Sequence, residues 1–302
     1  MKIGRAAWLT DTGRRRMRNE DAYVFEPPLF AIADGMGGAR AGEVAAGLAA
    51  GALREGRRDV VGEESLEASI AEANRRVWER SLADPSTAGM GTTVTVALVD
   101  APAGAVVFGH VGDSRAYRLR GDLLEQITTD HSLVAELVES GVITPEEAER
   151  HPQRSAITRA VGTESAIEID VFTVTAELGD LVLLCSDGLT DMLSEREIAS
   201  VLLEAERDPT LAAEELVAAA NARGGEDNIT VVLFELVEGE PEPVTDDDAM
   251  EEATSPAESE KADADAGVNR HGAGSGGRLA SLALLVGLAV IAGLALYWGI
   301  SR

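Results

Sequence analysis

The feature that most constrains the fold is a set of five short apolar runs, rich in β-branched residues and bounded by turn signals. Continuous runs of this kind are typical of strands that are buried on both faces. Segments with helical periodicity lie between them. The predicted strands are Leu29–Ala33, Thr92–Val99, Ala105–Val111, Leu181–Cys185 and Ile229–Leu236.

Helix starts are indicated by capping residues that precede apolar positions at helical spacing. They are Ser65, Thr144-Pro145, Ser194 with Glu197 as its capping-box partner, and Asp208-Pro209, whose helix ends at Gly224-Gly225. Two helices, over 42–58 and 65–82, follow one another before two successive strands. Because helices and strands do not alternate regularly, this order argues against a doubly wound parallel sheet. It favours antiparallel sheets covered by segregated helices, an α+β fold.

Aspartates stand at the ends of the predicted strands. Asp34, Asp113 and Asp187 follow strands, whereas Asp21 precedes a further short strand, Ala22–Phe25, and Asp227 precedes the last strand. In an antiparallel sheet the end of one strand lies beside the start of its neighbour, so these carboxylates can gather at one rim. Turn formation alone explains any single one of them. Five such residues from independent segments favour a common site.

The first hairpin allows a sharper prediction. If its turn centres on Pro27-Pro28, then Asp21 lies directly opposite Asp34. Prolines cannot adopt the positive φ of a tight hairpin turn, so the turn is expected to be wider and the register approximate. The two carboxylates should still be near neighbours.

Carboxylates gathered on a rim repel one another unless a cation lies between them. Ligands that are oxygen only, with no histidine or cysteine among them, point to Mg²⁺ or Mn²⁺ and away from zinc. The strand-end acids therefore predict a hard divalent-metal site.

Eight short motifs in a fixed order make the chain resemble the metal-dependent serine/threonine protein phosphatases, the PPM (type 2C) family, in its bacterial membrane-anchored form. The resemblance covers about residues 3–236. The motifs are Arg16-Met17-Arg18-Asn19-Glu20-Asp21, Ala33-Asp34-Gly35-Met36-Gly37-Gly38, Gly91-Thr92-Thr93, Gly112-Asp113-Ser114-Arg115, Asp130-His131-Ser132, Ile157-Thr158-Arg159-Ala160-Val161-Gly162, Cys185-Ser186-Asp187-Gly188-Leu189 and Gly225-Glu226-Asp227-Asn228-Ile229-Thr230.

The resemblance implies a four-layer αββα sandwich of two antiparallel sheets flanked by helices. It implies two Mn²⁺ or Mg²⁺ ions, with a third in bacterial relatives. By resemblance, Asp34 bridges two ions, the Gly35 carbonyl binds one of them, Asp187 and Asp227 complete the first site, Glu20 and Asp21 act through metal-bound water, and Asp113 with Asp187 holds the third ion.

In the family, paired cations activate a bridging hydroxide that attacks the phosphate in line. Arg16 matches the arginine that binds the phosphate, although it stands in a cluster of arginines that is also readable as a generic basic patch. Together, Arg16 and Asp34 are the expected catalytic residues. Met36 occupies the position where some relatives carry a histidine acid, so the general acid stays unassigned.

The segment between Ser132 and Ile157 resembles the family's flap, and Ser155 within it is a candidate ligand to the third ion. His131 is expected to be a structural hydrogen-bonding residue. Cys185, the single cysteine, cannot form an internal disulfide and is expected to be a small buried hydrophobe.

The composition changes after residue 237. Residues 1–237 carry 41 acidic against 22 basic side chains, and residues 238–278 carry 12 against 3 in a stretch poor in aliphatic residues. We expect a phosphatase domain over 1–237 and an acidic disordered linker over 238–278. The uncharged stretch 279–300 is long enough for a transmembrane helix. The alternative for 279–300 is a buried helix of a soluble domain.

The first residues contain no apolar run of signal-peptide length, and nearly all basic residues lie before the span. We therefore expect a single-pass cell-membrane protein whose N-terminal catalytic domain is cytoplasmic and monomeric. The formal net charge of −27 argues against nucleic acid as a partner, because no cationic surplus is available to displace counterions.

The expected function is hydrolysis of phosphoserine and phosphothreonine on proteins, in opposition to membrane serine/threonine kinases and acting on their substrates. Two alternatives stay open. One is a pseudoenzyme, a tethered binding module with an inactive phosphatase fold. The other is a phosphatase dedicated to one regulatory substrate.

Overall fold

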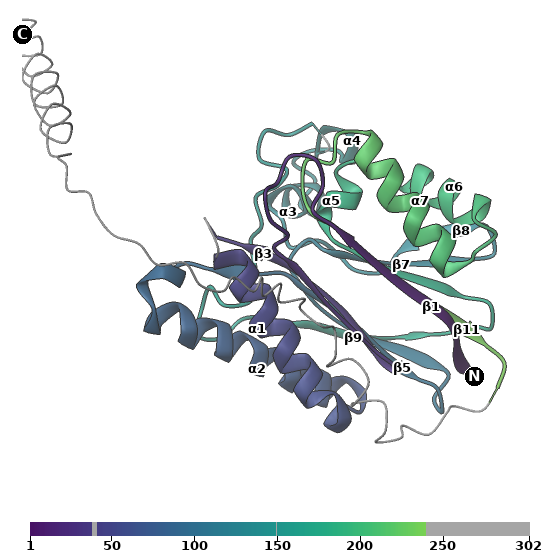
Figure 1. Cartoon of the computed structure of the whole chain (residues 1–302), viewed down its shortest axis with the longest axis horizontal. Helices are drawn as coiled ribbons and strands as arrows, with labels where there is room; N and C mark the ends of the chain where they lie inside the picture. Colours follow the sequence, from purple (N-terminus) through teal and green to yellow (C-terminus); the bar gives the residue numbers. More distant parts are fainter. Residues whose placement is uncertain (38–40, 149, 240–302) are drawn as a thin grey trace, which may run out of the picture. The chain divides into compact units, whose positions relative to one another are not determined.

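The computed structural model of the chain describes residues 1–37, 41–148 and 150–239 (Figure 1). Its strands are β1 Lys2–Asp11, β2 Asp21–Glu26, β3 Leu29–Met36, β4 Gly91–Thr92, β5 Val94–Asp100, β6 Ala105–Val111, β7 Arg115–Arg120, β8 Leu123–Gln126, β9 Asp170–Thr175, β10 Leu181–Cys185 and β11 Ile229–Val237. Its α-helices are α1 Ala41–Gly56, α2 Gly62–Ala83, α3 Leu133–Glu139, α4 Pro145–Ala148, α5 Asp187–Thr190, α6 Glu195–Glu204 and α7 Pro209–Ala222. Two short 3-10 helices are η1 Arg57–Asp59 and η2 Pro85–Thr87.

These strands form two antiparallel sheets. The first has the order β1-β11-β10-β7-β8, and the second has the order β2-β3-β5-β6-β9 with β4 attached to β3. Helices α1 and α2 cover the outer face of the second sheet, and α5 to α7 cover the first (Figure 1). The result is the α+β arrangement of helices, sheet, sheet and helices.

Three apolar layers explain why the predicted strands read as continuous apolar runs. Along β3, Leu29 and Ala31 pack against the helices, whereas Phe30 and Ile32 pack between the two sheets. All four side chains are at most 2% exposed. The Phe30 and Phe234 rings stack across the sheet interface with centroids 4.4 Å apart. Because both faces of these strands are covered, neither face needs polar residues.

Strands β1, β8 and β9 were not expected from the sequence. Each lies at an edge of its sheet, and their side chains are mostly half-buried or exposed. An edge strand with one poorly covered face accepts polar and charged residues, so it shows no continuous apolar run. Strand β7 was missed as well, because arginines alternate with its buried residues.

The predicted helix caps were mostly correct. The Ser194 and Glu197 capping box opens α6, and the Asp208 carboxylate accepts from the Thr210 and Leu211 N–H groups at the start of α7. The prediction for Ser65 was wrong, because α2 begins at Gly62. The Ser65 hydroxyl instead accepts from the Val61 N–H inside the first helical turn, at 2.6 Å.

The C-terminal predictions fall outside this description. The predicted linker from residue 240 onward and the predicted membrane helix over 279–300 are not among the described residues. Among the helices that are described, none combines the length and apolar character that a membrane crossing requires.

Candidate metal centre

The first hairpin places two acids directly opposite one another. Asp21 pairs with Asp34 in the β2–β3 ladder, as the two-residue turn predicts. The expectation of a wider turn was wrong, because Glu26 pairs with Leu29 and the two prolines alone make the turn. The peptide bond between Pro27 and Pro28 is cis.

The other strand-end acids come from both sheets. Asp187 follows β10, and Asp227 lies two residues before β11, both in the first sheet. Asp113 lies between β6 of the second sheet and β7 of the first. The rim therefore joins carboxylates from both halves of the sandwich.

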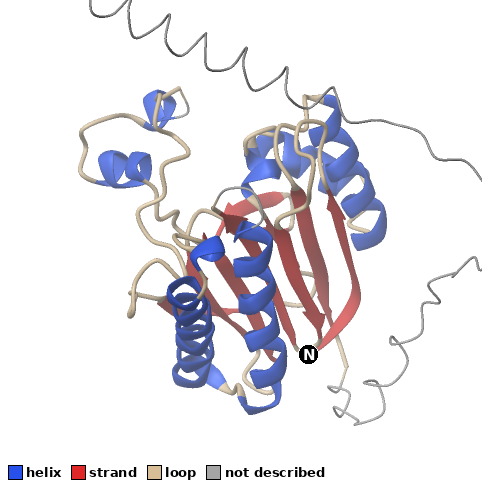
Figure 2. Cartoon of the chain, turned by 60° about the vertical axis from the view of Figure 1, so that its left-hand side comes forward, coloured by secondary structure: helices blue, strands red, loops and turns tan. Residues whose placement is uncertain are grey.

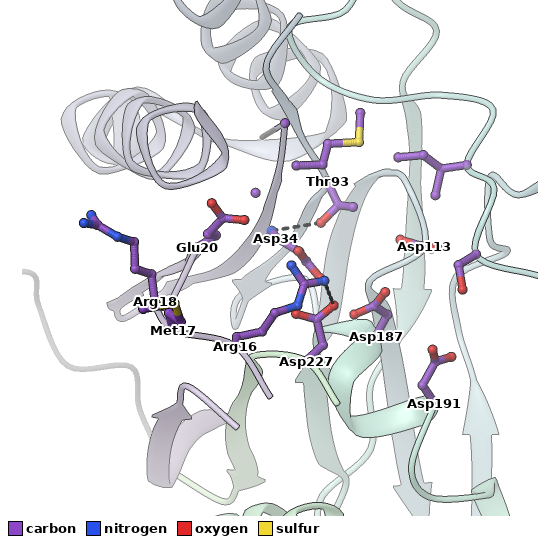
Figure 3. A pocket seen from close by; sticks show the side chains of 15 residues that line it. Arg16, Met17, Arg18, Glu20, Asp34, Thr93, Asp113, Asp187, Asp191 and Asp227 are labelled. Atoms are coloured by element: carbon purple, nitrogen blue, oxygen red, sulfur yellow. Dashed lines mark hydrogen bonds and ion pairs between the residues drawn. The ribbon is translucent and has the colours of Figure 1, made fainter. Parts of the chain in front are cut away.

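These segments line a cavity of about 630 Å³ (Figure 3). Its walls are Arg16, Met17, Arg18, Glu20, Asp34, Gly35, Met36, Gly37, Thr93, Asp113, Ser155, Ile157, Asp187, Asp191 and Asp227. The cavity thus brings together every predicted site residue except Asp21, Ser155 of the flap included. The ligand and catalytic roles of these residues stay predictions.

Asp21 is not part of the cavity wall, although it pairs with Asp34, which is. Its Oδ2 accepts hydrogen bonds from Ser186 Oγ at 2.9 Å and Thr230 Oγ1 at 2.6 Å, and its Oδ1 has no hydrogen-bond partner. Burial raises the pKa of Asp21 to about 6. Its place outside the cavity lining is compatible with a role at one remove from the cavity.

The carboxylates on the cavity wall have raised pKa values, because the folded structure disfavours their charged forms. Burial, followed by the charges of Asp21, Asp187, Asp113 and Asp227, raises the pKa of Asp34 well above its ordinary value. Burial and neighbouring carboxylate charges, that of Asp113 first, raise the pKa of Asp187 well above its ordinary value too. Burial, then Asp130, raises the pKa of Asp113 to about 6. Each shift has the sign that a missing counter-charge produces.

The donor set fits a hard divalent cation. Besides Asp21 Oδ1, Asp187 Oδ1 is buried without a hydrogen-bond partner. Buried oxygens of this kind are rare in native proteins and indicate a place for a ligand or an ion. The strand-end acids and the Gly35 carbonyl offer oxygen atoms, which magnesium and manganese prefer.

The acids are gathered but not yet arranged as ligands. Within residues 1–37, 41–148 and 150–239, no three His, Cys, Asp or Glu side chains already stand in a metal-ligand arrangement. Arg16 forms an ion pair with one of the acids, because its Nη2 lies 2.5 Å from Asp227 Oδ2 (Figure 3). The predicted phosphate-binding arginine and a predicted ligand therefore neutralise each other in this structure.

Close backbone packing explains the glycines that follow two of the acids. A Cβ on Gly35 would lie 2.2 Å from the Gly42 carbonyl oxygen, and one on Gly188 would lie 2.0 Å from that of Asn228. The Asp34 backbone is held in addition by Thr93, whose Oγ1 accepts from the Asp34 N–H at 3.0 Å. Only glycine allows these segments to approach so closely.

One acid of the cavity was missed from the sequence. Asp191 lines the wall, and burial raises its pKa. It follows Asp187 by four residues, so the i, i+4 spacing along α5 was the available signal. Arg154 of the flap segment approaches Asp191, with 4.0 Å between Nη2 and Oδ2.

The predicted flap is an excursion that carries α3 and α4, and its base closes where Ser132 and Ile157 form an isolated bridge. Figure 2 shows two short helices on a loop that leaves the sheets. His131, at the base, is 6% exposed, and its Nδ1 accepts from the Gly112 N–H at 3.1 Å. The expectation of a structural hydrogen-bonding histidine is confirmed.

Cys185 has the expected buried position. It is fully buried in β10, and burial raises the pKa of its thiol to about 12. Such a thiol stays protonated and packs as a small apolar side chain.

The family model for protein phosphatase 2C matches residues 14–220. The chain is 40% identical over 242 residues to serine/threonine phosphatase stp of Listeria innocua, which covers 76% of this chain and 95% of that protein. Among solved structures, the Mycobacterium tuberculosis serine/threonine phosphatase PstP/Ppp is 39% identical, with a TM-score of 0.73, and covers 78% of this chain and 100% of that one. The catalytic domain of PstP in complex with two manganese ions is 38% identical, with a TM-score of 0.71 and coverages of 78% and 99%.

Proposed function

The chain belongs to the protein phosphatase 2C family, and from this premise we propose that its acidic cavity hydrolyses phosphoserine and phosphothreonine on proteins. The chain is a metal-dependent protein serine/threonine phosphatase. The observation that carries the proposal is the meeting of Arg16 with half-buried carboxylates from segments of both sheets in one open cavity. A phosphate group needs a cationic partner, and the acids supply the place to hold metal cations beside it.

We propose the metal ligands that the family resemblance implies, and the cavity lining supports this choice because it contains all of them except Asp21. Asp34, Asp187 and Asp227 would hold the first two ions together with the Gly35 carbonyl, and Glu20 and Asp21 would support them at one remove. Asp113 and Asp187, with Ser155 as a candidate addition, would hold a third. Divalent cations bound there would lower the pKa of water and offset the negative charge that develops during phosphoryl transfer.

The side chains of the cavity divide the remaining work. Arg16 would hold two phosphate oxygens through its planar guanidinium once it leaves Asp227. Thr93 and Gly35 fix the Asp34 backbone, so that this carboxylate is held in place before substrate arrives. The thioether of Met36 has no proton to give, so the leaving serine or threonine oxygen must take its proton from another group or from water.

Metal dependence tests the proposal. Full-length protein should hydrolyse p-nitrophenyl phosphate and phosphothreonine peptides when Mn²⁺ or Mg²⁺ is supplied. EDTA should abolish turnover and added Mn²⁺ should restore it, because the gathered carboxylates need a counter-charge. Folded protein that shows no metal-dependent turnover would favour the inactive binding module. Hydrolysis of only one peptide in a panel of unrelated phosphopeptides would favour the dedicated phosphatase.

We further propose that a phosphatase domain over 1–237, monomeric and cytoplasmic, is tethered through an acidic linker over 238–278 to a membrane helix over 279–300. What supports this is the uncharged 22-residue stretch after the linker and the position of the basic residues before it. A tether to the surface that carries membrane serine/threonine kinases would raise the effective concentration of enzyme at their substrates.

Cell fractionation tests the tether. The full chain should sediment with membranes and resist extraction by high salt, whereas a chain ending at residue 237 should stay in the soluble fraction. A spanning helix withstands salt because its association is apolar and not electrostatic. Release of the full chain by salt alone would contradict a spanning helix.

A further inference from the structure

A short cationic loop lies at the mouth of the cavity and is not accounted for by the hydrolytic chemistry of the carboxylates. Residues 14–18 are four arginines and one methionine, and all five side chains are exposed. Met17 is 98% exposed, and both Met17 and Arg18 belong to the cavity wall (Figure 3). This concentration of positive charge stands out in a domain region where acids outnumber bases by 41 to 22.

The loop is held in one conformation by its neighbours. The Gly225 carbonyl accepts from the N–H groups of Arg14 at 2.7 Å and Arg15 at 3.2 Å. The buried Asn228 amide closes the loop, because its Nδ2 donates to the carbonyls of both Thr12, at 3.0 Å, and Arg18, at 2.8 Å. A loop fixed in this way loses little further entropy when a ligand binds.

The four guanidinium groups are not equally engaged. Arg16 pairs with Asp227, and Arg18 lies 3.8 Å from Glu43. Arg14 and Arg15 form no ion pair with any residue in the described part of the chain. Two charged side chains that directly precede Arg16 of the cavity wall are therefore available to a ligand.

We infer that Arg14 and Arg15 bind anionic side chains next to the phosphoserine or phosphothreonine of the substrate, so that the enzyme selects acidic or multiply phosphorylated segments. The inference rests on the proposed function. An extended peptide advances about 3.3 Å per residue, so neighbours one to three positions away lie within reach of the loop. The Debye length is about 8 Å at physiological salt, so the charges of the more distant acidic surface are largely screened at the loop.

Peptide competition tests the inference. The substrates are three matched phosphothreonine peptides with two flanking positions occupied by glutamine, by glutamate, or by one glutamate and one phosphoserine. We expect wild-type full-length protein with Mn²⁺ to favour both anionic peptides over the glutamine peptide by about fivefold to tenfold in kcat/KM, mostly through KM. The double variant Arg14→Ala/Arg15→Ala should bring both ratios close to one.

A matched variant separates local binding from net charge. Arg75→Ala/Arg196→Ala also removes two positive charges, on helices α2 and α6 away from the cavity, and should keep the wild-type ratios. Higher ionic strength should lower the wild-type preference. A wild-type ratio of one, or an equal loss of preference in both double variants, would overturn the inference. If no peptide is hydrolysed in a metal-dependent manner, the proposed function itself fails.

Discussion

Replacing Asp34 by asparagine is expected to lower kcat for phosphopeptide hydrolysis by about a thousandfold or more while the domain stays folded. Asp34 is half-buried on the cavity wall, feels the charges of four other carboxylates, and is the predicted bridge between two cations. Charge stabilisation by a bound metal is worth several kcal/mol in the transition state, and about 4 kcal/mol corresponds to a thousandfold in rate. Steady-state kinetics at saturating Mn²⁺ measures the loss, and retained activity would contradict the assignment.

The same variant has an opposite effect on stability that separates site chemistry from misfolding. Folding raises the pKa of Asp34, so keeping this carboxylate ionised at pH 7 opposes folding. In EDTA at pH 7, Asp34→Asn should therefore melt at a higher temperature than the wild type. The gap should shrink as the pH falls toward the ordinary carboxyl range, where Asp34 is protonated in both folded and unfolded chains.

Asp59→Asn serves as the matched control. Asp59 is exposed in η1 and lies outside the cavity, so the change should alter neither kcat nor the melting temperature in EDTA by a comparable amount. A lower melting temperature for Asp34→Asn in EDTA would mean that Asp34 supports the fold, and the loss of turnover would then need another explanation.

Replacing Arg16 by alanine is expected to lower kcat/KM by about a hundredfold or more. A guanidinium that holds two phosphate oxygens makes two charge-assisted hydrogen bonds, each worth about 1.5–3 kcal/mol. Arg16→Lys keeps the charge but not the fork of donors, so it should recover only part of the loss. Kinetics on a phosphothreonine peptide gives the comparison, and equal activity of the lysine variant and the wild type would exclude paired hydrogen bonds.

Arg16 has a second, measurable effect on metal binding. Because Arg16 pairs with Asp227 at 2.5 Å, it competes with a cation for that carboxylate. Arg16→Ala should therefore bind Mn²⁺ more tightly than the wild type in calorimetric titrations, although it is the poorer enzyme. Arg75→Ala removes an equal charge on α2 and should leave Mn²⁺ affinity unchanged. Weaker Mn²⁺ binding by Arg16→Ala would contradict competition for Asp227.

The elements that were predicted best from the sequence are those whose residue pattern is typical of only one kind of structure. Strands β3, β6, β10 and β11 are covered on both faces, so their apolar runs could only be buried strands. The pairing of Asp21 with Asp34 followed from counting back from the turn. The edge strand β1 escaped prediction because its half-exposed face tolerates polar residues, as a loop would.

The candidate site was predictable in membership but not in its internal contacts. Residues at the ends of paired antiparallel strands meet at the rim, which is why the positions of the acids along the chain were enough to group them. Two contacts of the site depend on packing between segments about 210 residues apart, so the sequence could not predict them. One is the pairing of Arg16 with Asp227, and the other is the hydrogen bond by which the Asn228 amide holds the arginine loop. Asp191 was missed because its neighbouring helix, α5, is only four residues long and shows no periodic pattern.

The rim is built from segments of both sheets, and this has a consequence for the stage of folding at which phosphatase activity can begin. Asp21 and Asp34 belong to strands of one sheet, whereas Asp187 follows a strand of the other sheet and Asp227 precedes one. Either sheet alone carries only part of the carboxylate set, and only the packing of Phe30 against Phe234 and their neighbours brings the parts together. If hydrolysis needs the whole predicted carboxylate set, a chain that is still being synthesised, or has lost one sheet to proteolysis, should not remove phosphates. Hydrolysis would then be confined to the completed domain.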